Sequence, residues 1–283
     1  MQETFLPSEL FEIHMEAGVK KAALPVYKLV FSGILAGFFI AIGGAASSAA
    51  VYQMADPGLA KWIAGMIFPV GLILVVLAGG ELFTGDCLMV SCVIRRKISV
   101  LSMVRVLGIV WFSNFLGAVM VSVLVYYSGM LDATSGALDA YFIQTAYQKV
   151  QIGLPKAICS GILCNILVCF AVLAAAAARS VTGKIWAIFF PIMSFVICGF
   201  EHCVANMFSI SVGLLAGGNT VYAAKAEELY GISSAMLEAI HPVDGLLQNL
   251  LFVTIGNILG GMVFVACPLY IIHQRKKRGS DAG

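Results

Sequence analysis

The chain has 283 residues, of which 60% are hydrophobic and only 11% charged, with a mean hydropathy of +0.97 and a formal net charge of +2. Soluble domains carry about 25% charged residues, so this composition excludes an ordinary soluble protein. Six nearly charge-free segments each exceed the roughly 20 residues that cross a hydrocarbon core. They predict an all-α polytopic membrane protein with spans at about 29–54, 62–94, 100–128, 152–178, 185–216 and 247–272.

Residues 1–28 form the first predicted unit, an amphipathic segment on the cytoplasmic side. The segment begins with acidic residues and lacks the apolar core of a cleavable signal peptide. Pro7-Ser8-Glu9-Leu10 is typical of a helix start, and the apolar residues that follow lean to one side. We expect a short helix at the membrane surface, with a positioning role favoured over a gating role.

Basic residues indicate the orientation. With six spans, thirteen of the 17 Lys and Arg residues fall on one side, in 20–28, 95–105, 179–184 and 275–278. The opposite side keeps Lys61, Lys149, Lys156 and Lys225. Because cytoplasmic loops are enriched in Lys and Arg, both termini are expected in the cytoplasm. The basic tail, 274–283, is therefore interpreted as a topology signal and not as a nucleic-acid site.

The second span is too long to be one helix. Residues 62–94 would extend roughly 50 Å at the rise of an α-helix, against a hydrocarbon core of about 30 Å. Its middle, 79–86, holds three glycines and two carboxylates. We expect a helix, a break and a short second helix, with Thr84 as the cap of the second helix and Asp86 in its first turn.

The fifth span, 185–216, repeats this pattern, and its centre carries Glu201 and His202 in an otherwise apolar run. The third span, 100–128, is expected to be a plain helix whose Asn114 bonds across a helix interface and does not line a pore. Residues 129–151 and 217–246 are expected to be outer loops.

Three spans followed by three, with a break in the second of each group, predict two inverted repeats within one channel domain, 29–273. Irregular backbone at membrane depth is tolerated only inside protein or beside water, so the breaks should meet and line a pathway. The two half-helix starts would attract an anion there. His202 is an ionisable group at membrane depth, which by default marks a functional site, and Thr84 is its expected hydrogen-bond partner. A buried neutral histidine held by Glu201 or a carbonyl is the alternative.

Eight cysteines lie in or beside the apolar spans without any C-x-x-C pair. This argues against disulfides, zinc and haem attachment. We interpret them as packing residues, with Cys203 noted because it follows His202, and we expect no metal and no cofactor.

Several motifs extend over nearly the whole chain. They are Ala17-Gly18-Val19-x-Lys21-Ala22, Leu82-Phe83-Thr84, Gln144-Thr145-Ala146-x-x-Lys149, Gly161-Ile162-Leu163-x-Asn165, Gly199-Phe200-Glu201-His202-x-x-Ala205-Asn206-Met207-Phe208 and Thr254-Ile255-Gly256-Asn257-Ile258. Together they resemble the formate/nitrite transporter family of pentameric anion channels. The resemblance implies an aquaporin-like fold, a homopentamer with one pore per protomer, small monovalent anions as partners, and a place in the lipid bilayer of the bacterial cytoplasmic (inner) membrane.

Carried over by position, the resemblance makes His202 the central pore residue and Thr84 its partner. It places Asn165 and Asn206 along the pathway and Lys149 below the outer vestibule. It gives constriction roles to Leu82, Phe83, Val168 and Phe195, with Leu72 and Ala205 narrowing the cytoplasmic side. Lys156 does not match the family's lysine and keeps a rim role.

The charged residues near the breaks allow two interpretations. A bare carboxylate in an anion pathway would repel the substrate, so Glu201, Glu81 and Asp86 are expected to serve the scaffold. Lys149 either attracts anions or pairs with an outer-loop acid, and both possibilities stay open.

The predicted function is a channel for small monovalent anions and not an enzyme, with formate favoured and hydrosulfide or nitrite next. His202 either stabilises the anion as imidazolium or gives it a proton, since an ordinary imidazole has a pKa of about 6.5. An aquaporin-like channel for neutral solutes is an alternative, but the paired Asn-Pro-Ala motifs are absent. A membrane enzyme using His202 and Cys203 would need further ligands.

Overall fold

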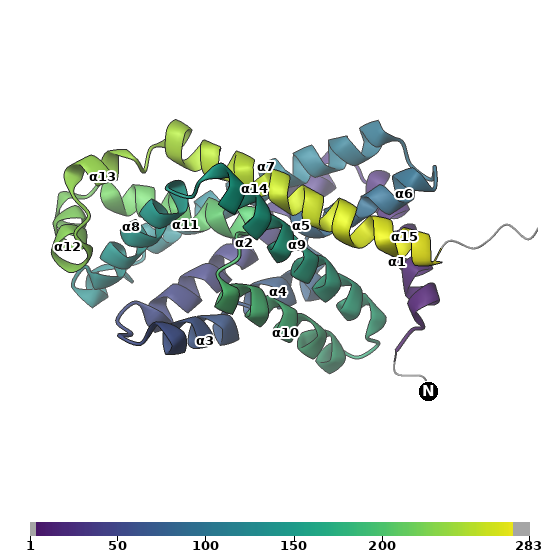
Figure 1. The fold of residues 1–283 in the computed structure, drawn as a ribbon, viewed down its shortest axis with the longest axis horizontal. Coiled ribbons are helices and arrows are strands. Elements are labelled where there is room, and N and C mark those ends of the chain that lie inside the picture. The colour runs from purple at the N-terminus through teal and green to yellow at the C-terminus, as the bar shows by residue number, and fades with distance from the viewer. Residues whose placement is uncertain (1–3, 274–283) are drawn as a thin grey trace, which may run out of the picture.

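The computed structural model describes residues 4–273, which fold into helices packed side by side (Figure 1). Six of the described helices or helix runs are long and apolar enough to cross a membrane, as predicted. They are α2 (Val26–Val51), α3 (Pro57–Ile67) with α4 (Val70–Ala78), α7 (Val100–Tyr127), α9 (Leu154–Ala177), α10 (Val181–Cys198) and the run Pro242–His273, which contains α14 (Gln248–Leu259) and α15 (Cys267–His273). The basic tail predicted at 274–283 lies outside the described residues.

The remaining helices are short. They are α1 (Pro7–Ala22), α5 (Phe83–Asp86), α6 (Val90–Ile94), α8 (Ala137–Val150), α11 (Cys203–Gly217), α12 (Thr220–Tyr230) and α13 (Ser234–Glu238). Helices α8, α12 and α13 gather at one end of the molecule, whereas α1, α6 and α15 lie at the other (Figure 1). The helix expected at the N-terminus is present as α1, and it contacts α15.

Two similar halves make up the bundle. The first half contains α2, α3 with α4, α5 with α6, and α7; the second contains α9, α10, α11 and the run with α14. In each half the first span packs along the third, α2 on α7 and α9 on α14 (Figure 1). The predicted arrangement of two three-span repeats, each with a broken second member, is confirmed.

Both breaks begin at a glycine in the left-handed conformation. Helix α4 ends at Gly79 with φ 75°, and α10 ends at Gly199 with φ 69°. A residue with a Cβ would pay roughly 1–2 kcal/mol for this backbone, so glycine is the residue that fits. Four residues later the chain re-enters a helix, at Phe83 in one half and at Cys203 in the other.

Two expectations about local structure are wrong. Thr84 does not cap α5, because the cap position belongs to Leu82 and no side chain caps it. The stretches expected to be loops contain α8 and α12. Helix α8 was missed because its composition is mixed; it packs against α11 and buries Phe142 and Ala146 there.

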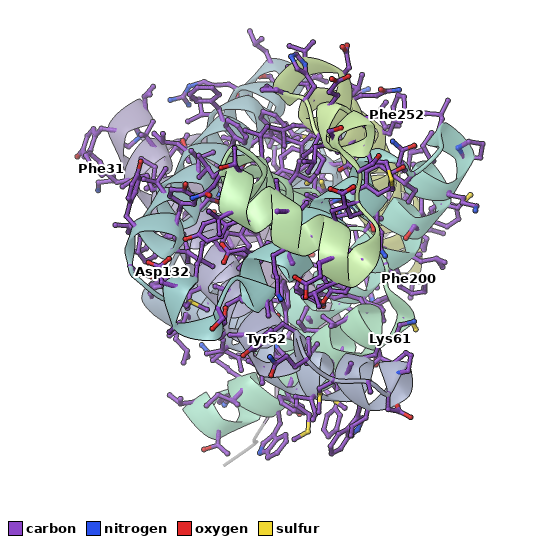
Figure 2. The ribbon with its side chains drawn as sticks, turned by 90° about the vertical axis from the view of Figure 1, so that its left-hand side faces the viewer. Phe31, Tyr52, Lys61, Asp132, Phe200 and Phe252 are labelled. Atoms are coloured by element: carbon purple, nitrogen blue, oxygen red, sulfur yellow. The ribbon has the colours of Figure 1, made fainter. Side chains whose placement is uncertain are left out.

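Figure 2 looks onto the end formed by these added helices, with α12 crossing the front. Tyr222 of α12 donates a hydrogen bond to Asp132, with 2.6 Å between the two oxygen atoms. This bond ties α12 to the segment before α8, so the end of the bundle is closed by helices and not by an open loop.

The crossing of α2 and α7 gives a stability prediction. A Cβ on Gly117 would overlap the carbonyl oxygen of Ile34, whereas a Cβ on Gly108 of the same helix meets nothing within 4 Å. Gly117→Ala should therefore lower the thermal unfolding temperature in detergent, because overpacking costs about 1–3 kcal/mol. Gly108→Ala is the matched control and should be neutral or slightly stabilising, since Ala favours helix over Gly by up to about 1 kcal/mol. Equal unfolding temperatures for both variants would contradict the close crossing.

Candidate functional site

The two breaks meet through one hydrogen bond. Thr84 Oγ1 lies 2.9 Å from His202 Nε2, although the two residues are 118 positions apart. Both side chains are buried, with Thr84 0% and His202 3% exposed. The structure thus brings together the pair that the sequence analysis placed opposite one another.

The contacts of His202 define its protonation state. His202 occupies the cap position of α11, and its Nδ1 accepts a hydrogen bond from the backbone N–H of Ala205 at 3.1 Å. A ring nitrogen that accepts carries no proton, so the neutral ring has its proton on Nε2 and donates it to Thr84 Oγ1. Adding a proton to Nδ1 would break the cap. Phe195 stacks on the ring, with 5.9 Å between centroids and 24° between planes.

An asparagine from the third span holds the first break. Asn114 of α7 accepts from the N–H of Phe83 at 3.0 Å through Oδ1. Its Nδ2 donates to the carbonyls of Gly33 at 2.8 Å and Glu81 at 2.9 Å. As expected, Asn114 bonds across a helix interface, and it is completely buried.

An equivalent asparagine holds the second break. Asn257 of α14 accepts from the N–H of Cys203 at 2.9 Å and donates to the carbonyls of Gly161 at 2.8 Å and Glu201 at 3.0 Å. Asn257 stands in one of the family motifs, but no role was predicted for it. The available signal was a shared spacing: Asn114 and Asn257 each precede a glycine by three positions in the third span of their half.

Asn165 connects the two breaks. Its Nδ2 donates to the carbonyl oxygens of Thr84 at 3.2 Å and Asn257 at 2.6 Å. Its side chain is 0% exposed. The amide group therefore braces the backbone around the Thr84–His202 contact.

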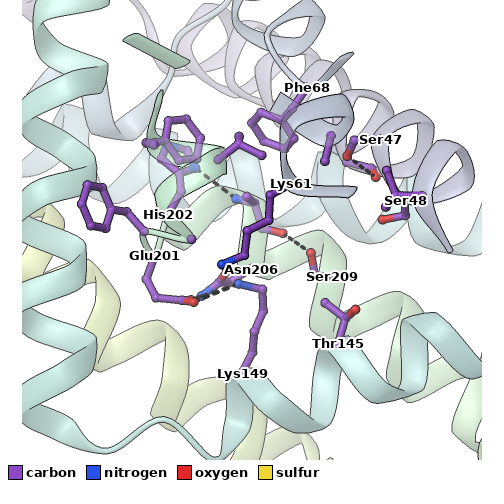
Figure 3. A pocket seen from close by; sticks show the side chains of 18 of the residues that line it. Ser47, Ser48, Lys61, Phe68, Thr145, Lys149, Glu201, His202, Asn206 and Ser209 are labelled. Carbon is purple, nitrogen blue, oxygen red and sulfur yellow. Dashed lines mark hydrogen bonds and ion pairs between the residues drawn. The ribbon is translucent and has the colours of Figure 1, made fainter. Parts of the chain in front are cut away.

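A cavity of about 370 Å³ opens beside His202 toward the end formed by α8 (Figure 3). We call it the α8-side cavity. Residues used below that line it are Ser48, Lys61, Phe68, Thr145, Lys149, Phe195, Glu201, His202, Ala205 and Asn206. Phe68 was not predicted; its ring meets Phe195 edge-on, 5.5 Å between centroids, so two aromatic rings stand beside the imidazole.

Lys149 is neutralised inside this cavity. Its Nζ lies 3.1 Å from both carboxylate oxygens of Glu201. Asn206 donates a further hydrogen bond to Glu201 at 2.5 Å and is itself 0% exposed. Glu201 thus ties the second break to α8, in the scaffold role expected of it, and the acid that Lys149 meets belongs to the break and not to the outer loop.

A second cavity, of about 170 Å³, lies on the side of α1. We call it the α1-side cavity; its lining includes His14, Lys21, Leu72, Leu82 and Asp86. Lys21 pairs with Glu81 at 2.5 Å and also with Asp86. Both acids of the first break are thus held by a lysine of α1, which agrees with their expected structural role.

The predicted constriction residues divide between the two sides. Leu72 and Leu82 line the α1-side cavity, whereas Phe195 lines the α8-side cavity. Ala205 was expected on the cytoplasmic side with Leu72, but it lies with His202 in the α8-side cavity because it follows His202 in the first turn of α11.

Phe83 and Val168 are buried core residues, 3% and 1% exposed, and line neither cavity. Lys156, given a rim role, also lies outside the lining of the α8-side cavity. Within residues 4–273, no group of three or more His, Cys, Asp or Glu side chains is placed to hold a metal ion.

Comparison with known proteins gives consistent matches. A family model described as formate/nitrite transporter matches residues 8–271. The chain is 37% identical over 274 residues to a probable formate transporter of Methanothermobacter thermautotrophicus, covering 90% of this chain and 92% of that protein. It is 33% identical over 278 residues to the formate channel FocA of Escherichia coli (strain K12), covering 97% and 96%.

Two solved structures share the fold. A pentameric formate channel with formate bound has a TM-score of 0.76 and 31% identity, covering 88% of this chain and 98% of that chain. An FNT family ion channel has a TM-score of 0.77 and 25% identity, covering 93% and 98%. These likenesses confirm the fold predicted from the sequence.

Replacing Asn257 tests whether its hydrogen bonds hold the second break in place; we call these hydrogen bonds the Asn257 clamp. Asn257→Ala would leave the N–H of Cys203 and the carbonyl of Glu201 buried without partners, and each such group costs about 1–3 kcal/mol. We expect loss of the monodisperse folded protein in gel filtration. Asn219→Ala removes only an exposed cap of α12, a change of about 1 kcal/mol, and should leave the elution profile intact. Normal elution of both variants would contradict the clamp.

The contact of α1 should depend on pH through His14. Its Nε2 lies 3.3 Å from the carbonyl oxygen of Leu88, and burial, with a contribution from Lys21, lowers the pKa of His14 below its ordinary value of 6.5. His14 therefore binds fewer protons when α1 is packed on the bundle than when α1 is detached. The packing of α1 on the bundle is complete above about pH 6.5, which is the pKa of His14 when α1 is detached. It weakens as the pH falls from there toward the lower pKa that His14 has when α1 is packed.

A spin label at the exposed position Glu16 reports this contact. Its mobility should rise as the pH falls below about 6.5. The His14→Gln variant keeps a polar group but does not titrate, so its label mobility should not change over this pH range. An equal rise in both proteins would show that His14 is not responsible.

Proposed function

Because the chain belongs to the formate/nitrite transporter family, we propose that it is a channel for small monovalent anions in the bacterial cytoplasmic membrane, with both termini cytoplasmic. Formate is the favoured substrate, with hydrosulfide or nitrite next, and the likeness to formate transporters and channels supports the choice of formate. The observation that carries the proposal is the buried Thr84–His202 hydrogen bond at the meeting point of the two breaks. The likeness to a pentameric channel supports a homopentamer.

The two cavities give the proposed path two ends. The lysine and arginine distribution supports a cytoplasmic position of the α1-side cavity and an outer position of the α8-side cavity. An anion entering the α8-side cavity meets Phe68 and Phe195 beside His202. Apolar side chains of this kind make the anion shed part of its water, which a hydrogen-bond donor must then replace.

His202 is proposed to act as a neutral donor. The first N–H groups of both half-helices are already bonded to Asn114, Asn257 and His202 itself, so they are not free to bind the anion directly. The Nε2–H of His202 and the hydroxyl of Thr84 face each other and are the donors that an anion can compete for. Forming an imidazolium would require Nδ1 to give up the N–H of Ala205, which favours the neutral ring as the resting state.

Formate flux into proteoliposomes, measured between pH 5 and 8 beside nitrite and hydrosulfide, tests this function. His202→Leu removes the donor and should reduce formate flux about tenfold, because one lost hydrogen bond of about 1.4 kcal/mol is tenfold in rate. His202→Asn keeps an N–H donor and cannot titrate, so flux should persist with an altered pH response and selectivity. Anion flux equal to wild type at every pH in both variants would refute the role of His202.

A further inference from the structure

Lys61 is a cation of the α8-side cavity that none of the described residues neutralises. It belongs to α3, lines the cavity and is exposed. Within residues 4–273 its ammonium group makes no ion pair and no hydrogen bond. In Figure 3 its side chain extends into the cavity toward the region of Lys149 and Asn206, from the opposite wall.

The local sequence does not explain this lysine. No acidic residue stands three or four positions away in α3, so Lys61 has no helical ion-pair partner. The nearby Asp56 is engaged as the cap of α3, accepting from the N–H of Leu59 at 2.7 Å. A lysine in the first half of a helix lies toward the positive end of the helix dipole, which gives it no stabilisation.

The charge balance of the cavity gives Lys61 a function. The charged side chains in the lining are Lys61, Lys149 and Glu201. Lys149 and Glu201 neutralise each other through two contacts of 3.1 Å. His202 is bonded as a neutral ring. The net positive charge of the cavity therefore comes from Lys61 and not from Lys149, to which the family resemblance assigned the attraction of anions.

We propose that Lys61 forms the entry binding site for the anion in the α8-side cavity, where it concentrates a small monovalent anion before the anion reaches His202. This inference rests on the proposed channel function. An unpaired charge in a recess of the protein surface raises the local concentration of counter-ions. The hydroxyl groups of Ser48 and Thr145 line the same cavity and supply hydrogen-bond donors. Because Lys61 is exposed and hydrated, the anion is held weakly enough to move on.

Unitary formate conductance in planar bilayers tests the site. Equal formate on both sides, at about 10 mM total ionic strength, makes the direction of insertion irrelevant. Lys61→Gln should lower the conductance about threefold or more, Lys61→Arg should retain it, and Lys61→Glu should lower it further. With about 1 M of a salt whose anion is too large to permeate, screening shortens the range of charge from about 30 Å to about 3 Å. The differences between the variants should then disappear.

Lys156→Gln is the matched control. Lys156 is also an exposed lysine of the outer group, but it does not line the cavity. Its removal should leave the conductance unchanged. Equal losses in Lys61→Gln and Lys156→Gln would show a general surface-charge effect and overturn the site.

A wild-type protein that conducts formate while Lys61→Gln conducts equally well would overturn this inference and leave the proposed channel function standing. A wild-type protein that conducts no formate, nitrite or hydrosulfide would overturn both.

Discussion

Two buried asparagines make the broken spans possible. A break at membrane depth frees backbone N–H and C=O groups, and in hydrocarbon each unsatisfied group costs several kcal/mol. Asn114 and Asn257 each satisfy one N–H and one carbonyl of a break and also bond a carbonyl in the first span of the same half, so one side chain joins the break to that span. Because an amide offers one acceptor and two N–H donors, it fits this task where a carboxylate or a hydroxyl would leave a group unpaired.

The hydrogen bonds of Asn114 and Asn257 also determine which polar groups remain free to bind an anion. They occupy the first N–H of each half-helix, and the carboxylates of the breaks are paired with Lys21 and Lys149. Lys149 and Glu201 therefore balance each other in the second break, and Thr84 with His202 offers hydrogen bonds between the breaks and not charge. Attraction of an anion then has to come from a group nearer the mouth, which is where Lys61 lies. In the proposed channel, charge at the entrance and neutral donors at the centre would let an anion enter without being trapped.

The sequence predicted those features that depend on local chain properties. The length of the second and fifth spans, with Gly79 and Gly199 inside them, was sufficient to predict the breaks, and an ionisable group in an apolar run identified His202. Features that depend on a distant partner were missed. They are the pairing of Lys149 with Glu201, the hydrogen bonds of Asn257 to the second break, and the position of Ala205 in the α8-side cavity. All three depend on how the helices pack in three dimensions. Helix α8 was missed because its burial against α11, and not its own hydropathy, stabilises it.

The two halves repeat each other in scaffold but differ at the site. Each break contains a glutamate followed five positions later by a second polar residue, Asp86 in one half and Asn206 in the other. The residue directly after the glutamate is Leu82 in the first half and His202 in the second. The repeat therefore provides two equivalent places for an imidazole and fills only one. Since Leu82 lines the α1-side cavity and His202 the α8-side cavity, the path presents an apolar side chain on one side of its centre and a hydrogen-bond donor on the other. In the proposed channel, this asymmetry would place one donor and one apolar side chain on opposite sides of the point that a small anion must pass.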